Sequence, residues 1–306
     1  MTDPAVMLAT LLESHRLILA ECAVAERLRR TPGVELHPTL FHTPFIYGPD
    51  AAREAMVSIY HGYIDAAKRA GLPLLLTAPT WRLDASRVAA AGVPATINPD
   101  AVAFLTELRP DDGPPVAVGA LVGPKGDCYR PELAPDTDEA ERFHTPQVHE
   151  LAETAADFLL AQTFPSVREA LGVARAMAAS GKPYAISFCT GTDGRVLDGT
   201  PLPDAMARLD DSLVRPPAGY FVNCTHPRFL LDHHRPGDLD RLIGIQANGS
   251  SRDVTALDGA AATEADPVET WAASMAELHV SHGVRILGGC CGTSLPHLEA
   301  LAAIEG

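Results

Sequence analysis

Three cysteines stand where apolar runs of the chain end, and two of them are adjacent. Cys290 and Cys291 follow the run VRILGG (284–289), and Cys224 closes the run GYFVNC (219–224). Thiolates are good ligands for a soft metal ion such as zinc. Successive side chains of a strand point to opposite faces, so an adjacent pair can share one ion only where the backbone leaves the strand. The glycines on both sides of the pair allow the backbone to do so.

Three thiolates and one open position make a catalytic zinc site, because a structural site fills all four positions with protein ligands. A free thiol is only roughly 3% ionised at pH 7, whereas a thiol bound to zinc has lost its proton. A thiol substrate in the fourth position would therefore be a nucleophile towards an electrophilic carbon. The residues favour alkyl transfer to sulfur over hydrolysis, for which histidine and carboxylate ligands are usual.

Other interpretations of these cysteines stay open at this point. Cys290 and Cys291 could form a strained vicinal disulfide, all three thiols could be buried and unreactive, or His226 could complete a closed Cys3His structural site. The remaining cysteines show no partner spacing, so packing is the role expected of Cys22, Cys128 and Cys189. Cys22 also ends the first apolar run, and we expect it to approach the pocket.

The segments that must position these thiols alternate between strands and helices. Eight apolar runs indicate parallel strands buried on both faces: RLILAE (16–21), LPLLLTA (72–78), PVAVGALVG (115–123), DFLLAQTF (157–164), KPYAISF (182–188), GYFVNC (219–224), RLIGIQAN (241–248) and VRILGG (284–289). Helices are predicted between most of them, over 50–71, 138–156, 166–181, 201–209 and 267–283, and three of these end at a glycine.

This alternation predicts an α/β fold, a single (β/α)8 TIM barrel that forms one domain over residues 1–306. The first strand is not followed by the glycine motif of a dinucleotide-binding sheet, which disfavours an open doubly wound fold. Segments 30–49 and 123–137 are predicted to be long loops, and Ser294 is predicted to cap the last helix with Pro296 in its first turn. A barrel gathers the carboxyl ends of its strands on one face, so Cys224 should lie near Cys290 and Cys291.

Composition limits the partners of the chain. Its 306 residues include 24 basic and 39 acidic side chains, a formal net charge of −15, which argues against nucleic acid because phosphate binding needs a basic surface. No run approaches the ~18 apolar residues of a membrane span, and the N-terminus lacks the positive charge of a signal peptide. We expect a soluble, cytoplasmic protein with reduced cysteines and small-molecule partners. Nothing in the sequence predicts its oligomeric state.

The segments GYFVNC and ILGGCCGT, with QTFPSVREAL, AISF and YIDAAKRAG, resemble the homocysteine S-methyltransferase family over nearly the whole chain. The resemblance implies a barrel that holds Zn²⁺ with Cys224, Cys290 and Cys291 and binds the sulfur of homocysteine in the fourth position. The chain is most similar to the short members of the family. We therefore expect a free small-molecule methyl donor, S-methylmethionine or S-adenosylmethionine.

The similarity is weakest around the expected substrate pocket. Glu21 takes the acidic place in a turn that is glycine-rich in the family, and Cys22 and Ala23 replace its glycines. Gln162 replaces an acidic residue that helps to bind the substrate amino group. An amide can accept a hydrogen bond, but this bond lacks the additional strength that the charge of a carboxylate provides. Trp81 offers an aromatic face to a sulfonium or ammonium donor. The residues that we expect to line the pocket are Glu21, Cys22, Thr77, Trp81, Gln162 and Asn223.

The expected activity is methyl transfer to homocysteine, which gives methionine. Two alternatives follow from the altered pocket. The acceptor could be another thiol or selenol that lacks the usual free α-amino group, or the chain could bind a metal or thiol without turnover.

Overall fold

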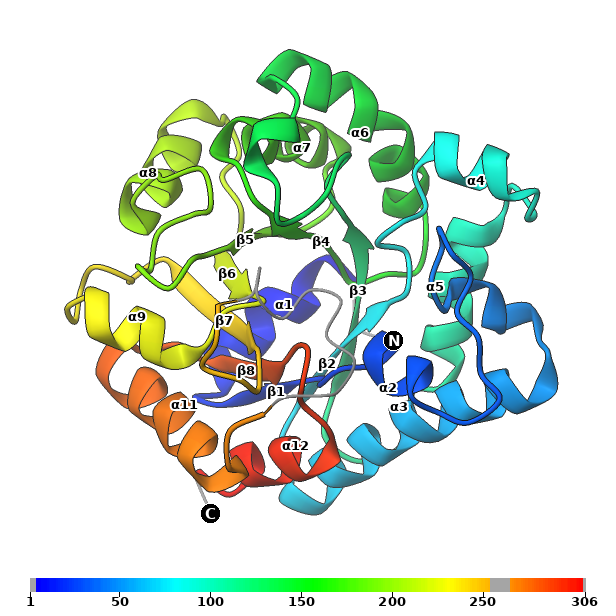
Figure 1. The fold of residues 1–306 in the computed structure, drawn as a ribbon, viewed down its shortest axis with the longest axis horizontal. Helices are drawn as coiled ribbons and strands as arrows, with labels where there is room; N and C mark the ends of the chain where they lie inside the picture. Colours follow the sequence, from blue (N-terminus) through cyan, green and yellow to red (C-terminus); the bar gives the residue numbers. More distant parts are fainter. Residues whose placement is uncertain (1–3, 254–264, 305–306) are drawn as a thin grey trace.

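Eight parallel strands close into a barrel in the computed structural model, which describes residues 4–253 and 265–304 (Figure 1). The strands are β1 (Ile18–Ala20), β2 (Leu74–Ala78), β3 (Val116–Val122), β4 (Phe158–Phe164), β5 (Tyr184–Cys189), β6 (Tyr220–Asn223), β7 (Leu242–Ala247) and β8 (Ile286–Gly289). They follow one another in chain order, and β8 pairs with β1 to close the ring. The predicted strands and the barrel are confirmed, with strand ends that differ from the predicted ones by at most two residues.

Helices surround the barrel (Figure 1). Those predicted from the sequence are α3 (Asp50–Ala70), α6 (Thr137–Ala152), α7 (Val167–Ser180), α8 (Leu202–Ser212) and α11 (Val268–His282). As predicted, Ser294 begins α12 (Leu295–Ala302), through a reciprocal capping box with His297. The sequence patterns did not predict α1 (Pro4–Ser14), α2 (Ala25–Arg29), α4 (Ala85–Ala91), α5 (Ile97–Glu107) and α9 (Pro227–His233). Three of these have only five to seven residues, too few to show a helical period.

The two predicted loops are confirmed, and each contains one short 3-10 helix. Segment 30–49 holds η1 (Thr43–Tyr47), and segment 123–137 holds η2 (Pro131–Leu133). Within the described residues, no helix has the length and apolar character needed to cross a membrane.

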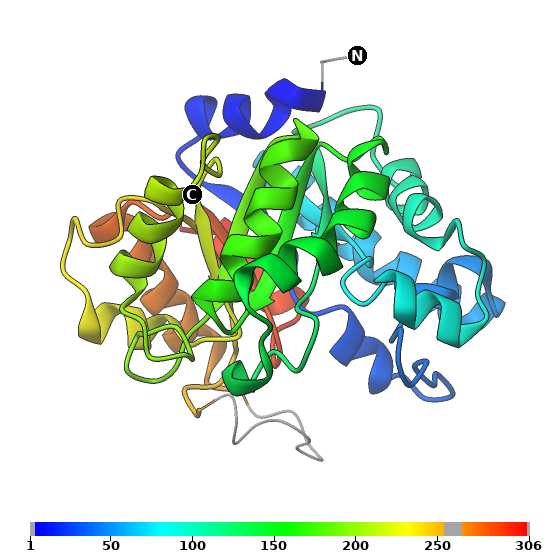
Figure 2. The same ribbon diagram turned by 90° about the horizontal axis from the view of Figure 1, so that it is seen from above.

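Two separate apolar cores position the strands. The larger core lies between the strands and the surrounding helices, and the smaller fills the barrel interior. Helix α1 closes the amino-terminal end of the barrel, where Leu8 and Leu11 join the interior core with Phe158 (Figure 2). Alternation along each strand decides which side chains point inward. On β5, Ala185 belongs to the interior core while Ile186 faces the helices.

Candidate metal centre

The thiols of the predicted triad lie at the carboxyl ends of β6 and β8. The sulfur atoms of Cys224 and Cys290 are 3.1 Å apart, although 66 positions separate them in the sequence. Cys224 is buried, Cys290 is half-buried, and Cys291 is exposed with its thiol hydrogen-bonded to that of Cys290. All six cysteines of the chain are free, so the vicinal disulfide is not present. The structure therefore brings two of the three thiols into contact and places the third beside them.

Local backbone geometry turns the cysteines out of their strands. Cys224 has a φ of 55°, a left-handed conformation that is rare outside glycine, and Gly292 has a φ of 80°. Backbone hydrogen bonds then tie the Cys-Cys segment to the end of β7. The amide of Cys290 donates to the carbonyl of Ala247 at 2.7 Å, and the carbonyl of Cys291 accepts from Gly249 at 2.8 Å. The loop after β8 is thus held against the end of β7.

A fourth cysteine, which the sequence patterns assigned to packing, belongs to the same cluster. Cys189 ends β5, is fully buried and packs against Cys224. The sequence patterns predict that this strand ends one residue earlier, at 188. The thiol of Cys189 was therefore not predicted to lie at the end of a strand, on the same face of the barrel as Cys224. The four thiols of Cys189, Cys224, Cys290 and Cys291 form a continuous series of neighbours, which we call the thiol series.

The chemistry of these donors fits a soft metal ion. Hydrogen bonds with Cys189, Cys224 and Cys290 respectively raise the pKa values of Cys224, Cys290 and Cys291 well above the ordinary value. Without a cation these groups are therefore thiols, and metal binding must release their protons. In the described part of the chain, no set of three or more histidine, cysteine, aspartate or glutamate side chains is already arranged to hold an ion. The exposed Cys291 would have to turn inward to join Cys224 and Cys290.

His226 does not complete the site as a fourth ligand. Its Nδ1 accepts a hydrogen bond from the amide of Arg228 at 3.3 Å, and its Nε2 lies 3.4 Å from a carboxylate oxygen of Asp266. Nδ1 is thus engaged by a backbone amide and Nε2 faces Asp266 without a hydrogen bond, so the Cys3His alternative is not supported.

Glu21 and Thr77 form a buried polar pair at the end of β1 and β2. One carboxyl oxygen of Glu21 accepts from the amide of Thr77 at 3.0 Å, and the other accepts from the Thr77 hydroxyl. Burial raises the pKa of Glu21 to about 7, because desolvation outweighs these two hydrogen bonds. Glu21 is therefore partly protonated at neutral pH.

Glu21→Gln should make the free energy of unfolding less dependent on pH. The pKa of Glu21 is about 7 in the folded protein and about 4.5 without the fold, so its stabilising contribution is complete below pH 4.5 and is lost as pH rises through 7. Between pH 5 and pH 8 the wild type should lose about 2 to 3 kcal/mol more than Glu21→Gln. Urea denaturation at both pH values measures this difference.

The exposed Glu107 offers a matched control. Glu107→Gln should keep the pH dependence of the wild type. Parallel pH profiles for Glu21→Gln and the wild type would show that Glu21 does not carry this shift.

Gln162 and Asn223 are both fixed by side-chain hydrogen bonds at the barrel mouth. Gln162, on β4, donates through Nε2 to Oε1 of Gln246 on β7 at 2.5 Å. The carbonyl oxygen of Asn223 accepts from the amide of Thr163 at 3.1 Å and from the Ser187 hydroxyl, which leaves its amide group to donate to the sulfur of Cys224 at 3.4 Å. Gln246 was not predicted, although it stands two residues before the end of an apolar run (241–248).

The side chains of Trp81 and Cys22 are held in place by contacts with other residues of the chain. The indole nitrogen of Trp81 donates to the Gln162 carbonyl at 3.1 Å, and one ring face stacks on Phe41, with ring centroids 5.8 Å apart. The guanidinium of Arg82 lies 4.8 Å from the Trp81 ring. Cys22 is buried in the outer core and hydrogen-bonds to Thr293, away from the thiol series. The structure thus groups Glu21 with Thr77 and Gln162 with Gln246, while Cys22 packs behind the loop after β8.

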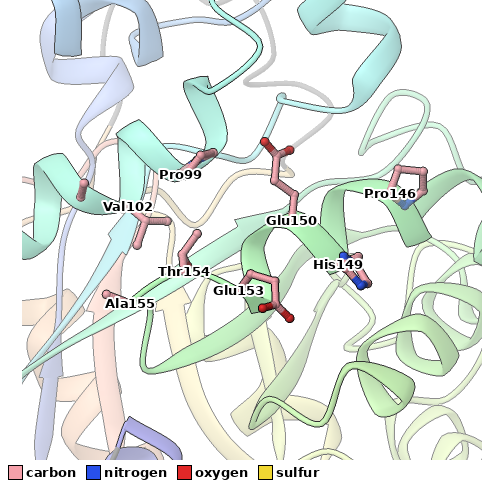
Figure 3. A pocket seen from close by; sticks show the side chains of 9 residues that line it. Pro99, Val102, Pro146, His149, Glu150, Glu153, Thr154 and Ala155 are labelled. Atoms are coloured by element: carbon pink, nitrogen blue, oxygen red, sulfur yellow. The ribbon is translucent and has the colours of Figure 1, made fainter.

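A surface pocket lies away from these residues. It measures about 570 Å³ and is lined by α5 and α6, with Pro99, Val102 and Glu150 among its residues (Figure 3). Ala155 also lines the pocket, and it lies just before the start of β4. This part of the pocket is therefore on the amino-terminal side of the barrel. The pocket is therefore separate from the thiol series.

A closed (β/α)8 barrel with cysteines gathered at the carboxyl ends of β5, β6 and β8 places the chain among barrel enzymes that carry their site on this face. The model of the family described as homocysteine S-methyltransferase matches residues 8–304. The chain belongs to this family.

Curated relatives and solved structures agree with that assignment. Homocysteine S-methyltransferase YbgG of Bacillus subtilis (strain 168) is 30% identical over 202 residues, and the match spans 62% of each chain, less than two thirds of that relative. Homocysteine S-methyltransferase of Escherichia coli (strain K12) is 25% identical over 97% of each chain. An S-methylmethionine–homocysteine S-methyltransferase of Mus musculus is 26% identical over 51% of this chain and 46% of the relative. The metallated form of homocysteine methyltransferase MmuM from Escherichia coli has a TM-score of 0.73 at 22% identity, over 98% of this chain and 99% of that one, which shows a shared fold.

Proposed function

We propose that this protein is a zinc-dependent S-methyltransferase that transfers a methyl group from S-methylmethionine or S-adenosylmethionine to homocysteine and forms methionine. The observation that carries the proposal is the contact between Cys224 and Cys290, with Cys291 adjacent, at the carboxyl face of the barrel. Membership of the homocysteine S-methyltransferase family supports the acceptor. The name of the mouse relative supports S-methylmethionine as the first donor to test.

Cys224, Cys290 and Cys291 would hold the zinc ion. Bound zinc supplies an acceptor thiol that is already deprotonated, so no general base is needed during transfer. Asn223 positions and stabilises the Cys224 sulfur through its amide, whose orientation is fixed by Thr163 and Ser187. A hydrogen bond donated to a thiolate partly neutralises the negative charge on its sulfur.

The amino-acid part of the acceptor would lie between two polar pairs. Glu21 with Thr77, and Gln162 with Gln246, present oxygen atoms and amide groups at the mouth of the barrel. These groups can hydrogen-bond to the ammonium and carboxylate of homocysteine. Orientation of the acceptor sulfur towards the donor methyl is the main contribution expected from them, because an in-line transfer depends on alignment.

Metal analysis and a product assay test the proposal. The protein, purified without chelator and with a phosphine reductant, should contain about one zinc ion per chain, and homocysteine with S-methylmethionine or S-adenosylmethionine should give methionine over many turnovers. Far less than one zinc per chain, or no product with either donor, would overturn it.

A second candidate function is methyl transfer to a thiol that lacks the free α-amino group. Two observations favour it. Gln162 and Gln246 form a neutral pair, and the raised pKa of Glu21 leaves that residue only partly ionised at neutral pH. The mouth of the barrel thus offers little fixed negative charge to an ammonium group.

Gln162→Glu should shift acceptor selectivity towards homocysteine. A carboxylate at this position adds a charge-assisted hydrogen bond to the ammonium group, worth about 1.5 kcal/mol or more. The ratio of kcat/KM for homocysteine to that for 4-mercaptobutanoate, its deaminated analogue, should rise about tenfold. Competition assays with the two acceptors measure the ratio. An unchanged ratio would show that position 162 does not contact the amino group.

A further inference from the structure

Cys189 points into the barrel mouth with the residues of the candidate site. It shares a face of β5 with Ser187, whose hydroxyl donates to Asn223, and its backbone is in register with Asn223 on β6. The side chain is fully buried and packs with Cys224, Cys290 and Tyr129. Its position is therefore fixed beside the proposed ligands and shielded from solvent.

The partners of Cys189 distinguish it from the other two cysteines outside the proposed triad. Cys22 hydrogen-bonds to the Thr293 hydroxyl, and Cys128 is buried outside the cluster that Cys189 forms with Cys224. Cys189 instead packs directly against Cys224, whose sulfur is 3.1 Å from that of Cys290. It is thus the first member of a thiol series whose other three members are the proposed zinc ligands.

We propose that Cys189 is a fourth protein ligand of the metal ion while no acceptor is bound, in the position that the acceptor thiol takes during turnover. The proposal rests on the zinc centre proposed above. Four thiolates close a tetrahedral site and exclude water from it. When the acceptor enters, it gives up its thiol proton and Cys189 takes up a proton as it leaves, so the exchange conserves charge and needs no oxidant or reductant.

The exchange predicts a weaker apparent affinity for the acceptor than an open site would have. If Cys189 occupies the position for nine tenths of the time, the apparent Kd of the acceptor is raised about tenfold. Cys189→Ala should remove this competition and lower the apparent Kd of homocysteine by about the same factor.

X-ray absorption at the zinc edge tests the proposal without relying on activity. Wild-type holoprotein without acceptor should show four sulfur ligands at about 2.3 Å, whereas Cys189→Ala should show three sulfurs and one lighter ligand at about 2.0–2.2 Å. Added homocysteine should give four sulfurs in both proteins. Cys128→Ala is the matched control and should keep four sulfurs in the absence of acceptor.

Three sulfurs and a lighter ligand in the acceptor-free wild type would overturn the role of Cys189, and this measurement does not depend on whether the variant folds. An unchanged apparent Kd in folded Cys189→Ala, measured by calorimetry, would also count against it. Absence of zinc from the wild type would instead overturn the proposed function. Zinc bound by three sulfurs together with methyl transfer would leave the proposed function intact.

Discussion

Cys290→Ala should lose most of its bound zinc and at least about 99.9% of its methyl-transfer rate. Cys290 lies between Cys224 and Cys291 in the thiol series, with its sulfur 3.1 Å from that of Cys224 and its thiol hydrogen-bonded to Cys291. Zinc sites of this kind bind with about 10 to 16 kcal/mol in total, so one of three protein thiolates contributes about 3 kcal/mol or more, a hundredfold or greater loss of affinity. The remaining ion would also be misplaced, which lowers the rate further.

Metal content by mass spectrometry and the methionine assay check this result. Cys128→Ala should keep both zinc and activity, because Cys128 is buried but does not pack with Cys189, Cys224 and Cys290. Cys290→Ala with one zinc per chain and wild-type turnover would contradict the assignment of this residue as a ligand.

Gly289→Ala should destabilise the fold and weaken metal binding together. The backbone of Gly289 has an ordinary conformation, but an added Cβ would overlap the Thr293 hydroxyl and lie 2.9 Å from the sulfur of Cys22. The Thr293 hydroxyl donates to the carbonyl of Cys290 at 2.6 Å and accepts from the amide of Ala23 at 3.3 Å. Displacement of Thr293 therefore moves the segment that carries Cys290. We expect a loss of about 1 to 3 kcal/mol in the free energy of unfolding and about tenfold weaker zinc binding.

Urea denaturation of the metal-free protein and competition with a chelator measure the two effects separately. Gly62→Ala is the matched control, because Gly62 lies in helix α3 and an added Cβ would meet Leu295 at an ordinary 3.7 Å. That variant should be as stable as the wild type or more stable, since alanine favours a helix over glycine by about 1 kcal/mol. Wild-type stability and zinc affinity in Gly289→Ala would show that the loop after β8 tolerates the displacement.

The sequence was sufficient to predict the barrel because its strands are buried on both faces. A run such as LPLLLTA is apolar at nearly every position, whereas the helices on either side of it contain both apolar and polar residues. Closure of the ring then follows from eight such strands in chain order, and it gathers the ends of β6 and β8. The contact between Cys224 and Cys290 is a direct consequence of this topology.

Side-chain partners across the barrel mouth could not be predicted in the same way. The pairing of Gln162 with Gln246 joins β4 to β7, and it depends on strand tilt and register that no local pattern encodes. The thiol of Cys189 was missed because a one-residue difference at a strand end decides whether a side chain belongs to the site. Helix α1 was missed because its role, to cover the interior core with Leu8 and Leu11, is defined only once the barrel exists.

The covered end of the barrel has a consequence for the kinetics. Leu8 and Leu11 of α1 close the amino-terminal end, and they share the interior core with Phe221. Acceptor and donor must therefore share one entrance, and an acceptor seated against the buried Cys224 occupies the deeper place. We expect a compulsory order of binding in which the thiol enters first, and high concentrations of donor should inhibit the enzyme by blocking that entrance.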